Sequence, residues 1–151
     1  MAGVWSESAA AAFLPLLPEG HALPQLDPRR FAEIVADPAV RLLVAEGDGL
    51  LGYTLFGASR DHDLPADVGE VRTFFVRPAA WRHGVGSALM SGALSALPEL
   101  GYTAASVWSF AGSERANAFY ERHGFVRDGA ERREEAWAGI LEVRLRRRLG
   151  A

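Results

Sequence analysis

The sequence predicts an α/β fold in which helices pack on a central mixed sheet. Stretches with apolar residues at helical spacing alternate along the chain with short runs rich in β-branched and aromatic residues. Glycine, proline and aspartate separate these stretches. A length of 151 residues and an apolar fraction of 49 % are ordinary for one globular domain. We therefore expect a single domain over residues 1–151 with a hydrophobic core of its own.

Two helices are predicted near the N-terminus. Residues 6–17 place apolar side chains at helical spacing. In the second helix, Asp27 is a suitable N-cap acceptor and Pro28 suits the first turn. The apolar stripe that follows ends before Pro38, because the residue ahead of a proline disfavours helical geometry.

Three strands are predicted next. Residues 41–46 and 50–58 are β-rich and are separated by a Gly-Asp-Gly hairpin signal. Residues 59–69 are polar and contain a proline, so they predict a loop. A third β-rich run, residues 70–77, stops at Pro78.

Helices and strands alternate through the rest of the chain. The predicted elements are a helix at 85–97, a strand at 103–110, a helix at 113–123, and strands at 125–128 and 140–147. The full order is therefore α-α-β-β-β-α-β-α-β-β, which favours a mixed α+β sheet flanked by helices.

Composition excludes several kinds of chemistry. The chain has no cysteine and no lysine, since all 16 basic residues are arginines. It therefore has no thiolate nucleophile, no Schiff-base lysine and no lysine for a Walker-type phosphate loop. The net charge of −3 argues against a nucleic-acid-binding protein. The arginines at 144 and 146–148 alternate through Leu145, which indicates an edge strand with a frayed end.

No metal site and no membrane segment are expected. Asp61-His62-Asp63 is one local cluster without a second set of ligands, so a solvated loop is the favoured interpretation. No apolar run approaches the roughly 20 residues that span a bilayer. No basic residue precedes the alanine-rich start, so a secretory signal is not expected. We therefore expect a cytoplasmic protein.

The sharpest local signal is the run Trp-Arg-His-Gly-Val-Gly-Ser at residues 81–87, between a predicted strand and a predicted helix. Its glycines allow a tight turn and a close backbone approach to a ligand. The N-terminus of the following helix suits an anion such as pyrophosphate, and Arg82 would add charge. The alternative is a glycine-rich turn with no ligand.

A second motif favours the functional interpretation. Residues 113–125 read Ser-Glu-Arg-Ala-Asn-Ala-Phe-Tyr-Glu-Arg-His-Gly-Phe, a helix that ends at a glycine cap. Together with Trp-Arg-His-Gly-Val-Gly at 81–86, this segment resembles the GNAT superfamily of acetyl-CoA-dependent N-acetyltransferases. The resemblance covers about residues 70–129, and the order of elements agrees from about residue 40 to residue 147.

The resemblance implies an acetyl-CoA site and a direct attack by a primary amine of a small molecule or peptide. The segment Phe74, Phe75, Val76 would pair with the pantetheine arm. The backbone of Arg82, His83, Gly84, Val85, Gly86 and Ser87 would hold the pyrophosphate. Ser113 and Asn117 stand where the family contacts the pantetheine arm. No metal is implied, and a homodimer is an oligomeric state to test.

Two residues are the catalytic candidates. Tyr120 matches a tyrosine that protonates the departing thiolate in many family members, and a tyrosine hydroxyl is a credible acid for that step. Glu70 matches a position where some members place a carboxylate near the acceptor amine. From the residues alone, Tyr120 could instead be a core tyrosine, and Glu70 could be a solvated strand start.

Three departures from the family pattern are visible. Trp81 stands where glutamine or arginine usually begins the phosphate loop, and Ser113 replaces an asparagine. Few residues precede the first helix, where the family usually has a strand. A non-catalytic acyl-CoA-binding regulatory or partner domain is therefore the alternative function. The acceptor itself is left open, and residues 130–138 are interpreted as a solvated hairpin.

Overall fold

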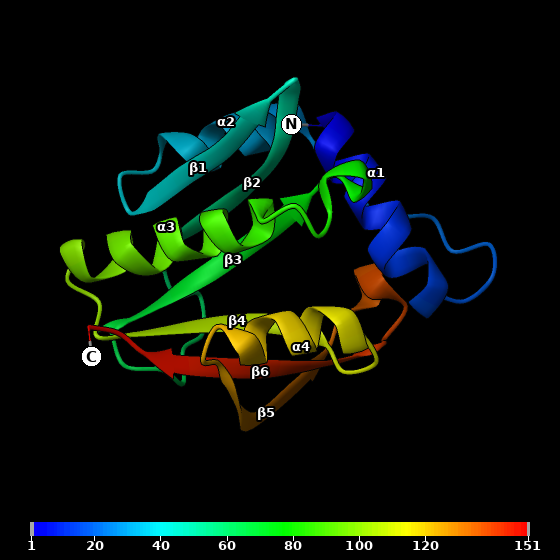
Figure 1. Cartoon of the computed structure of the whole chain (residues 1–151). Helices are drawn as coiled ribbons and strands as arrows, with labels where there is room; N and C mark the ends of the chain where they lie inside the picture. Colours follow the sequence, from blue (N-terminus) through cyan, green and yellow to red (C-terminus); the bar gives the residue numbers. More distant parts are fainter. Residues whose placement is uncertain (1, 151) are drawn as a thin grey trace.

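The computed structural model describes residues 2–150 and shows a six-stranded mixed sheet with helices on both faces (Figure 1). This confirms the predicted fold class. The sheet has the strand order β1-β2-β3-β4-β6-β5. Its strands are β1 (Val40–Gly47), β2 (Gly49–Ala58), β3 (Val68–Val76), β4 (Ala104–Phe110), β5 (Val126–Arg133) and β6 (Leu141–Arg148).

The four predicted helices are present. They are α1 (Ala2–Phe13), α2 (Pro28–Ala36), α3 (Val85–Glu99) and α4 (Glu114–Arg122). The Asp27 side chain accepts a hydrogen bond of 2.9 Å from the Arg29 amide, which confirms the predicted cap of α2. The first helix begins four residues earlier than predicted, so within residues 2–150 no strand precedes it. None of these helices has the length and apolarity needed to cross a membrane.

Three sequence-based boundaries or placements are wrong. β3 begins at Val68 and not at residue 70, because Val68–Glu70 pair with β4. β5 continues to Arg133, so half of the segment predicted as a solvated hairpin is strand. β6 pairs with β4 on one side and β5 on the other. It is therefore an interior strand, where the alternation of arginines and apolar residues had indicated an edge.

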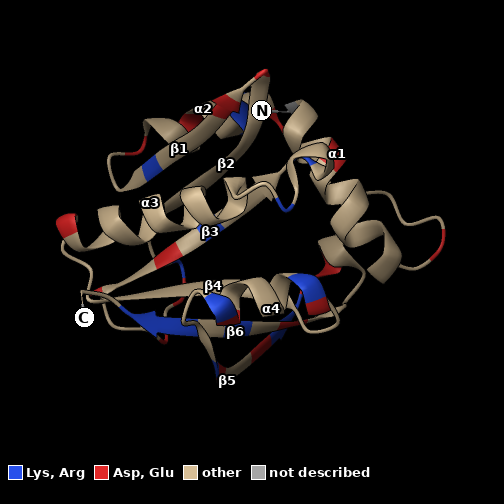
Figure 2. Ribbon diagram, in the orientation of Figure 1, with Lys and Arg blue, Asp and Glu red and all other residues tan. Residues whose placement is uncertain are grey.

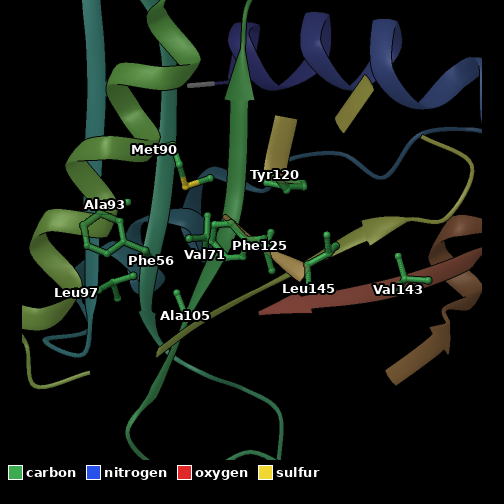
Figure 3. Packing of buried hydrophobic residues seen from close by; sticks show 11 residues of the cluster. Phe56, Val71, Met90, Ala93, Leu97, Ala105, Tyr120, Phe125, Val143 and Leu145 are labelled. Atoms are coloured by element: carbon green, nitrogen blue, oxygen red, sulfur yellow. The ribbon is translucent and has the colours of Figure 1, made fainter. Parts of the chain in front are cut away.

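Helices α3 and α4 cover one face of the sheet (Figure 1), and the main core lies between them and the strands, where Figure 3 shows its buried side chains. Met90, Ala93 and Leu97 of α3 are fully buried. They belong to one cluster with Phe56 and Val71 of the strands beneath them. The cluster continues under α4 through Tyr120, Phe125, Val143 and Leu145. This core joins α3 to the second motif, whereas Trp81 and Val85 of the first motif pack on a smaller cluster formed by Val76, Ala80 and Leu89.

Helices α1 and α2 pack against the opposite face. Phe13 of α1 meets Phe75 of β3 edge to face, with ring centroids 6.1 Å apart. The Ser8 hydroxyl of α1 donates a 2.8 Å hydrogen bond to the Val76 carbonyl. From α2, Phe31 meets Tyr53 of β2 in the same way at 5.9 Å. We call this surface the α1 face and the opposite one the α3/α4 face.

The parallel strands β3 and β4 pair over only three residues. Val68, Gly69 and Glu70 are in register with Ala104, Ala105 and Ser106. Beyond these residues the two strands diverge (Figure 1), although β3 continues to Val76. Their facing edges therefore have no strand partner. This divergence opens the middle of the sheet.

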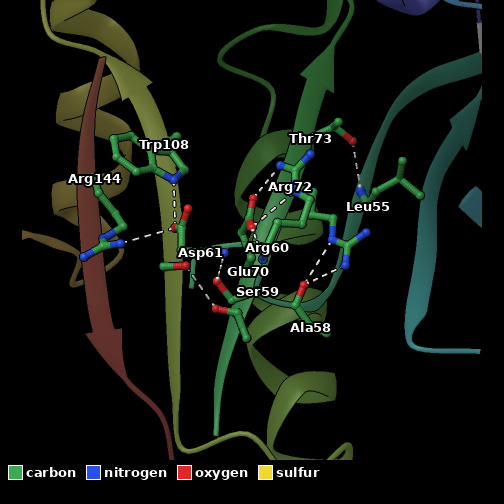
Figure 4. Close-up of polar contacts among 12 residues, drawn as sticks. Leu55, Ala58, Ser59, Arg60, Asp61, Glu70, Arg72, Thr73, Trp108 and Arg144 are labelled. Atoms are coloured by element: carbon green, nitrogen blue, oxygen red, sulfur yellow. Dashed lines mark hydrogen bonds and ion pairs between the residues drawn. The ribbon is translucent and has the colours of Figure 1, made fainter. Parts of the chain in front are cut away.

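Arg144 of β6 connects the loop between β2 and β3 to the other half of the sheet, the half formed by β4, β6 and β5 (Figure 4). Its guanidinium forms ion pairs with Asp61 at 3.4 Å, Asp63 at 2.8 Å and Asp128 at 2.6 Å, although its side chain is only 5 % exposed. The Trp108 indole N–H donates to Asp61 at 2.9 Å. The loop that was predicted to be solvated is therefore fixed by charge.

We expect Arg144→Leu to lower the free energy of unfolding by about 2 kcal/mol, because it leaves the largely buried Asp61 and Asp128 carboxylates without their cation. The melting temperature should fall by roughly 4–8 °C. The hydrogen bond from Arg144 holds the pKa of Asp63 below its ordinary value. That part of the stabilisation is present above the ordinary pKa and is lost as the pH falls through the lowered one.

The matched control is Arg146→Leu, two residues further along the same strand. Arg146 makes no ion pair with the part of the chain that the structure describes, residues 2–150. Thermal unfolding of the two variants at neutral pH compares them directly. Equal losses would show that Arg144 contributes through packing alone.

Candidate active site

An open cavity of about 780 Å³ lies where β3 and β4 diverge. Its walls include Val71–Val76 of β3 and Val107–Phe110 of β4. Residues of α3 and α4 line it on one side of the sheet, and residues of α1 line it on the other. The cavity therefore crosses the sheet and is accessible from both faces.

The glycine-rich run at 81–87 forms a tight turn at the cavity and caps α3. Arg82 and Gly84 both have left-handed backbone geometry, with φ of 64° and 81°. The first amide of α3 that bonds to the turn is that of Ala88, which donates to the Gly84 carbonyl. The amides before it are the ones that an α-helix leaves without an internal partner. They face a cavity lined by Arg82, Gly84, Gly86 and Ser87, whereas His83 and Val85 do not line it.

Trp81, the first departure from the family pattern, holds a guanidinium at this turn. The Arg115 guanidinium carbon of α4 lies 3.1 Å from the centroid of the Trp81 ring. The Trp81 indole N–H donates a 2.8 Å hydrogen bond to the Val76 carbonyl, which fixes the ring. The indole thus positions an arginine from the second motif beside the first motif.

Three arginines stand at the cavity on the α3/α4 face without carboxylate partners. Arg82, Arg115 and Arg122 all line the cavity, and α4 carries basic residues at both ends (Figure 2). Within residues 2–150 no carboxylate lies within ion-pair distance of any of them. Partial burial lowers the pKa of Arg115, and repulsion from Arg82 lowers it further. This side of the cavity therefore favours an anion.

The segment Phe74, Phe75, Val76, which is predicted to pair with a pantetheine arm, lines the cavity. Phe74 packs toward α4, with its ring 5.3 Å from that of Phe119, and Phe75 faces α1. A bulge lies just before this segment, because Phe56 pairs with Val71 whereas the adjacent Leu55 pairs with Thr73. The bulge adds one residue to the unpaired edge of β3 and turns that edge locally.

Tyr120 lines the cavity and is 8 % exposed. Its ring packs against Phe119 and Phe125. Burial raises the pKa of Tyr120 to about 12, so the hydroxyl keeps its proton at neutral pH. The core and catalytic interpretations are therefore compatible for this residue, since the ring is in the core and the side chain borders the cavity.

Glu70 is neither a solvated strand start nor a lining residue of the cavity. It is 1 % exposed and lies at the point where β3 and β4 cease to pair. One carboxylate oxygen accepts from the Arg60 amide at 3.0 Å, and the other accepts from the Arg60 guanidinium at 2.5 Å (Figure 4). Burial alone would lower the pKa of Arg60, but the hydrogen bond and charge of Glu70 raise it above its ordinary value.

Ser113 and Asn117, the other two cofactor candidates, differ in their positions. Ser113 is the N-cap residue of α4, its hydroxyl makes no capping bond, and it lines the cavity. Asn117 is 5 % exposed and does not line the cavity. Its side-chain amide donates to the carbonyls of Phe110 and Ala111, which fixes the end of β4 against α4. The structure therefore gives Asn117 a supporting position.

Charged residues from distant parts of the chain line the cavity on the α1 face. Arg132 donates hydrogen bonds of 3.1 and 3.2 Å to Glu142 and forms a 2.9 Å ion pair with Glu134. The Arg132 guanidinium also lies 4.2 Å from the centroid of the Trp108 ring. Glu142 comes from β6 and Arg132 from β5, and the two are cross-strand partners. Sequence reasoning missed this cluster because only the pairing of these strands brings it together.

No group of histidine, cysteine or carboxylate residues within 2–150 has the arrangement of a metal site. The two aspartates of Asp61-His62-Asp63 are instead ion-paired with Arg144.

The fold combines three features: parallel strands that diverge, a glycine-rich turn at the start of a helix, and a cavity through the sheet. This combination is the fold of GNAT-type acyltransferases. The acetyltransferase (GNAT) family matches residues 7–125, and the chain belongs to this family. No curated protein matches the sequence.

Solved structures share the fold at low sequence identity. A ribosomal-protein-alanine N-acetyltransferase from Brucella melitensis superposes with a TM-score of 0.75 at 18 % identity, over 98 % of this chain and 91 % of the other. An acetyltransferase from Thermus thermophilus gives 0.72 at 20 % identity, over 98 % and 88 %. The PaiA N-acetyltransferase from Thermoplasma acidophilum, solved with coenzyme A, gives 0.70 at 13 % identity, over 97 % and 89 %.

Proposed function

We propose that this acyltransferase moves an acetyl group from acetyl-CoA to a primary amine of a small molecule or peptide. The observation that carries the proposal is the single cavity that crosses the sheet, with unpaired arginines at one face and carboxylates at the other. A polyanionic acyl donor and a cationic acceptor have opposite charges. Each would find its complement on a different face, and the two would meet between β3 and β4.

The residues at the α3/α4 face fit the phosphate-bearing part of acetyl-CoA. The turn at 82–87 offers backbone amides and the positive end of a 15-residue helix. Arg82 and Arg115 add two cations, and Arg115 supplies the charge that Trp81 does not. The unpaired edge of β3 at Phe74–Val76 can pair with the amide groups of a pantetheine arm, as a partial strand addition.

The transfer needs a proton for the departing thiolate and a polarised thioester carbonyl. Tyr120 keeps its proton at neutral pH and borders the cavity, so it is the proposed acid for the leaving sulfur. A backbone N–H of the unpaired β3 edge is the proposed hydrogen-bond donor to the carbonyl oxygen. Neither step uses a cysteine or a lysine, which the chain lacks.

Release of coenzyme A, measured across a panel of primary amines, tests the proposal. Turnover with at least one amine is the expected result. Tight coenzyme A binding without turnover on any amine would instead favour the alternative, a non-catalytic acyl-CoA-binding domain on the same fold. The position of Tyr120 at the cavity is the feature that favours catalysis.

Gly84→Asp should abolish coenzyme A binding in calorimetry, because it places a negative charge in the turn that faces the anion. The matched control is Gly101→Asp. Both glycines have a positive φ, and a side chain at either would enter open space, but Gly101 follows the opposite end of α3. Undiminished binding by Gly84→Asp would contradict the assignment of the turn.

Arg115→Gln should weaken coenzyme A binding by about 10-fold, or about 1.4 kcal/mol, which is the lower range for a hydrogen bond to a charged group. The lower range applies because the arginine lies at the rim of an open cavity. Arg127→Gln, at an exposed arginine on β5 that does not line the cavity, is the control. Equal dissociation constants for wild type and Arg115→Gln would show that Arg115 only packs on Trp81.

Tyr120→Phe should lower turnover on an accepted amine by about 10²–10⁴-fold and leave coenzyme A affinity nearly unchanged, because it removes the acid and keeps the ring. Tyr53→Phe is the matched control. Burial also raises the pKa of Tyr53 to about 12, but that side chain does not line the cavity. Steady-state kinetics with both variants decide the matter, and wild-type turnover in Tyr120→Phe would leave the residue a packing role only.

A further inference from the structure

On the α1 face of the cavity, two carboxylates share one guanidinium. Glu134 and Glu142 share the single guanidinium of Arg132, whose Nε lies 2.9 Å from one carboxylate and 3.1 Å from the other. The nearby Arg60 is already held by Glu70. The cluster Glu134–Arg132–Glu142 therefore has one carboxylate in excess, and a single ammonium group would balance it.

Glu142 is the carboxylate of this cluster best placed to exchange a proton with a ligand. Its side chain is 7 % exposed and lines the cavity, whereas that of Glu134 is 43 % exposed. Burial raises the pKa of Glu142, although the hydrogen bond from Arg132 opposes this, and a raised pKa makes the carboxylate a stronger base. Glu70 is also buried, but it does not line the cavity and so cannot contact a ligand there.

The charged groups that face Glu142 come from three places. Arg132 and Glu134 belong to β5 and the turn after it, and Arg60 comes from the loop between β2 and β3. Arg144, two residues further along β6, is ion-paired with three aspartates. Arg72, which also lines the cavity, has no carboxylate partner among residues 2–150, and its guanidinium donates hydrogen bonds to the Ala58 carbonyl. A carboxylate next to the acceptor amine would still be repelled by Glu134 and Glu142.

Aromatic rings form the rest of this wall. Phe13 of α1, Phe110 of β4 and Trp137 make three mutual edge-to-face contacts, with centroids 5.1 to 5.4 Å apart. Trp5 extends the wall through its contact with Phe75 at 6.3 Å. All of these side chains line the cavity. Such a surface favours a large apolar or aromatic group, and its ring faces also favour a nearby cation.

We propose that Glu134–Arg132–Glu142 and this aromatic wall form the acceptor site, with Glu142 as the base. The acceptor is then a primary amine on an aromatic or large apolar body, with no second charged group near the amine. This inference rests on the proposed acetyl transfer and deepens it.

Glu142 would deprotonate the acceptor before the acetyl group is transferred. The acceptor ammonium gives one proton to the Glu142 carboxylate and becomes a neutral amine. The amine nitrogen then forms a C–N bond to the thioester carbon as the C–S bond breaks. Tyr120 gives its proton to the departing thiolate and regains one from the second proton that the nitrogen loses, and Glu142 returns its proton to solvent. The products are an amide and free coenzyme A.

The pH dependence of kcat/KM for phenethylamine separates Glu142 from Glu70. An alkylammonium titrates near the lysine value, roughly 10.4, so only about one molecule in a thousand is neutral at pH 7.4. With a working base, kcat/KM should be flat from the pKa of Glu142 up to that of the amine. In Glu142→Gln, kcat/KM at neutral pH should be about 10²–10⁴-fold lower and should rise about tenfold per pH unit.

The comparison variant is Glu70→Gln. Its kcat/KM should still be independent of pH over the same range, even if the value of kcat/KM differs from that of wild type. Glu121→Gln, at an exposed glutamate of α4 that does not line the cavity, controls for the loss of one charge. A flat profile in Glu142→Gln together with a sloping profile in Glu70→Gln would overturn the assignment and restore Glu70 as the base. Thermal unfolding of each variant verifies that it is folded.

A binding measurement without acetyl-CoA tests the site independently of turnover. Calorimetry should show that phenethylamine binds wild type about tenfold more tightly than it binds Glu142→Gln. Wild type should also bind phenethylamine more tightly than it binds spermidine, which carries several positive charges, or phenylalanine, which carries a carboxylate. Equal binding by Glu142→Gln and wild type would overturn the ammonium site.

Failure of the acceptor site and failure of the proposed function give different results. If wild type acetylates spermidine or phenylalanine in preference to phenethylamine, acetyl transfer stands and the acceptor class is wrong. If wild type acetylates no amine but binds phenethylamine through Glu142, the transfer fails and the amine site stands. Equal binding by Glu142→Gln overturns the site in either case.

Discussion

The architecture of the site depends on the loss of pairing between β3 and β4 after Glu70 and Ser106. Two facing strand edges are left without a partner strand in the middle of a sheet, and backbone groups at such edges need side chains, water or a ligand as partners. The Glu70–Arg60 ion pair lies at the point of divergence. Beyond that point, Phe74 packs against Phe119 of α4 on one face of β3, and Phe75 packs against Phe13 of α1 on the other.

The same divergence explains why charge is distributed so unevenly. A continuous sheet would separate the two faces, but here residues from both faces line one cavity. Arg82, Arg115 and Arg122 are without carboxylate partners on the α3/α4 face of the described chain, whereas the Glu134–Arg132–Glu142 cluster on the α1 face has a carboxylate in excess. Two ligands of opposite charge can therefore approach from opposite sides and react between the strands without competing for the same groups. No covalent intermediate on the protein is needed for such an arrangement.

Sequence alone predicted the parts of the site that neighbouring residues determine. The turn at 82–87 follows from its glycines, and the position of Tyr120 follows from helical spacing within α4. The partners of Glu70 and Glu142 could not be predicted, because each contact depends on strand order and register. Arg60 reaches Glu70 across the loop between β2 and β3, and Arg132 meets Glu142 only because β5 and β6 pair in this register. The prediction of an edge strand at 140–147 was wrong for the same reason: arginines such as Arg144 are satisfied by aspartates from distant segments.

Glu70 and Glu142 illustrate why burial and an arginine partner do not by themselves distinguish a catalytic carboxylate from a structural one. Both are nearly inaccessible to solvent, and each accepts hydrogen bonds from one guanidinium. The two glutamates differ in the number of carboxylates that share the arginine and in whether the glutamate lines the cavity. Arg60 donates to Glu70 from both its guanidinium and its backbone amide, so that pair is neutral, and Glu70 itself does not line the cavity. Arg132 is shared between two carboxylates at the cavity wall, so the charge there is incomplete until a cation arrives. A neutral pair leaves no charge for a ligand where the strands diverge, whereas an unbalanced one favours a cation.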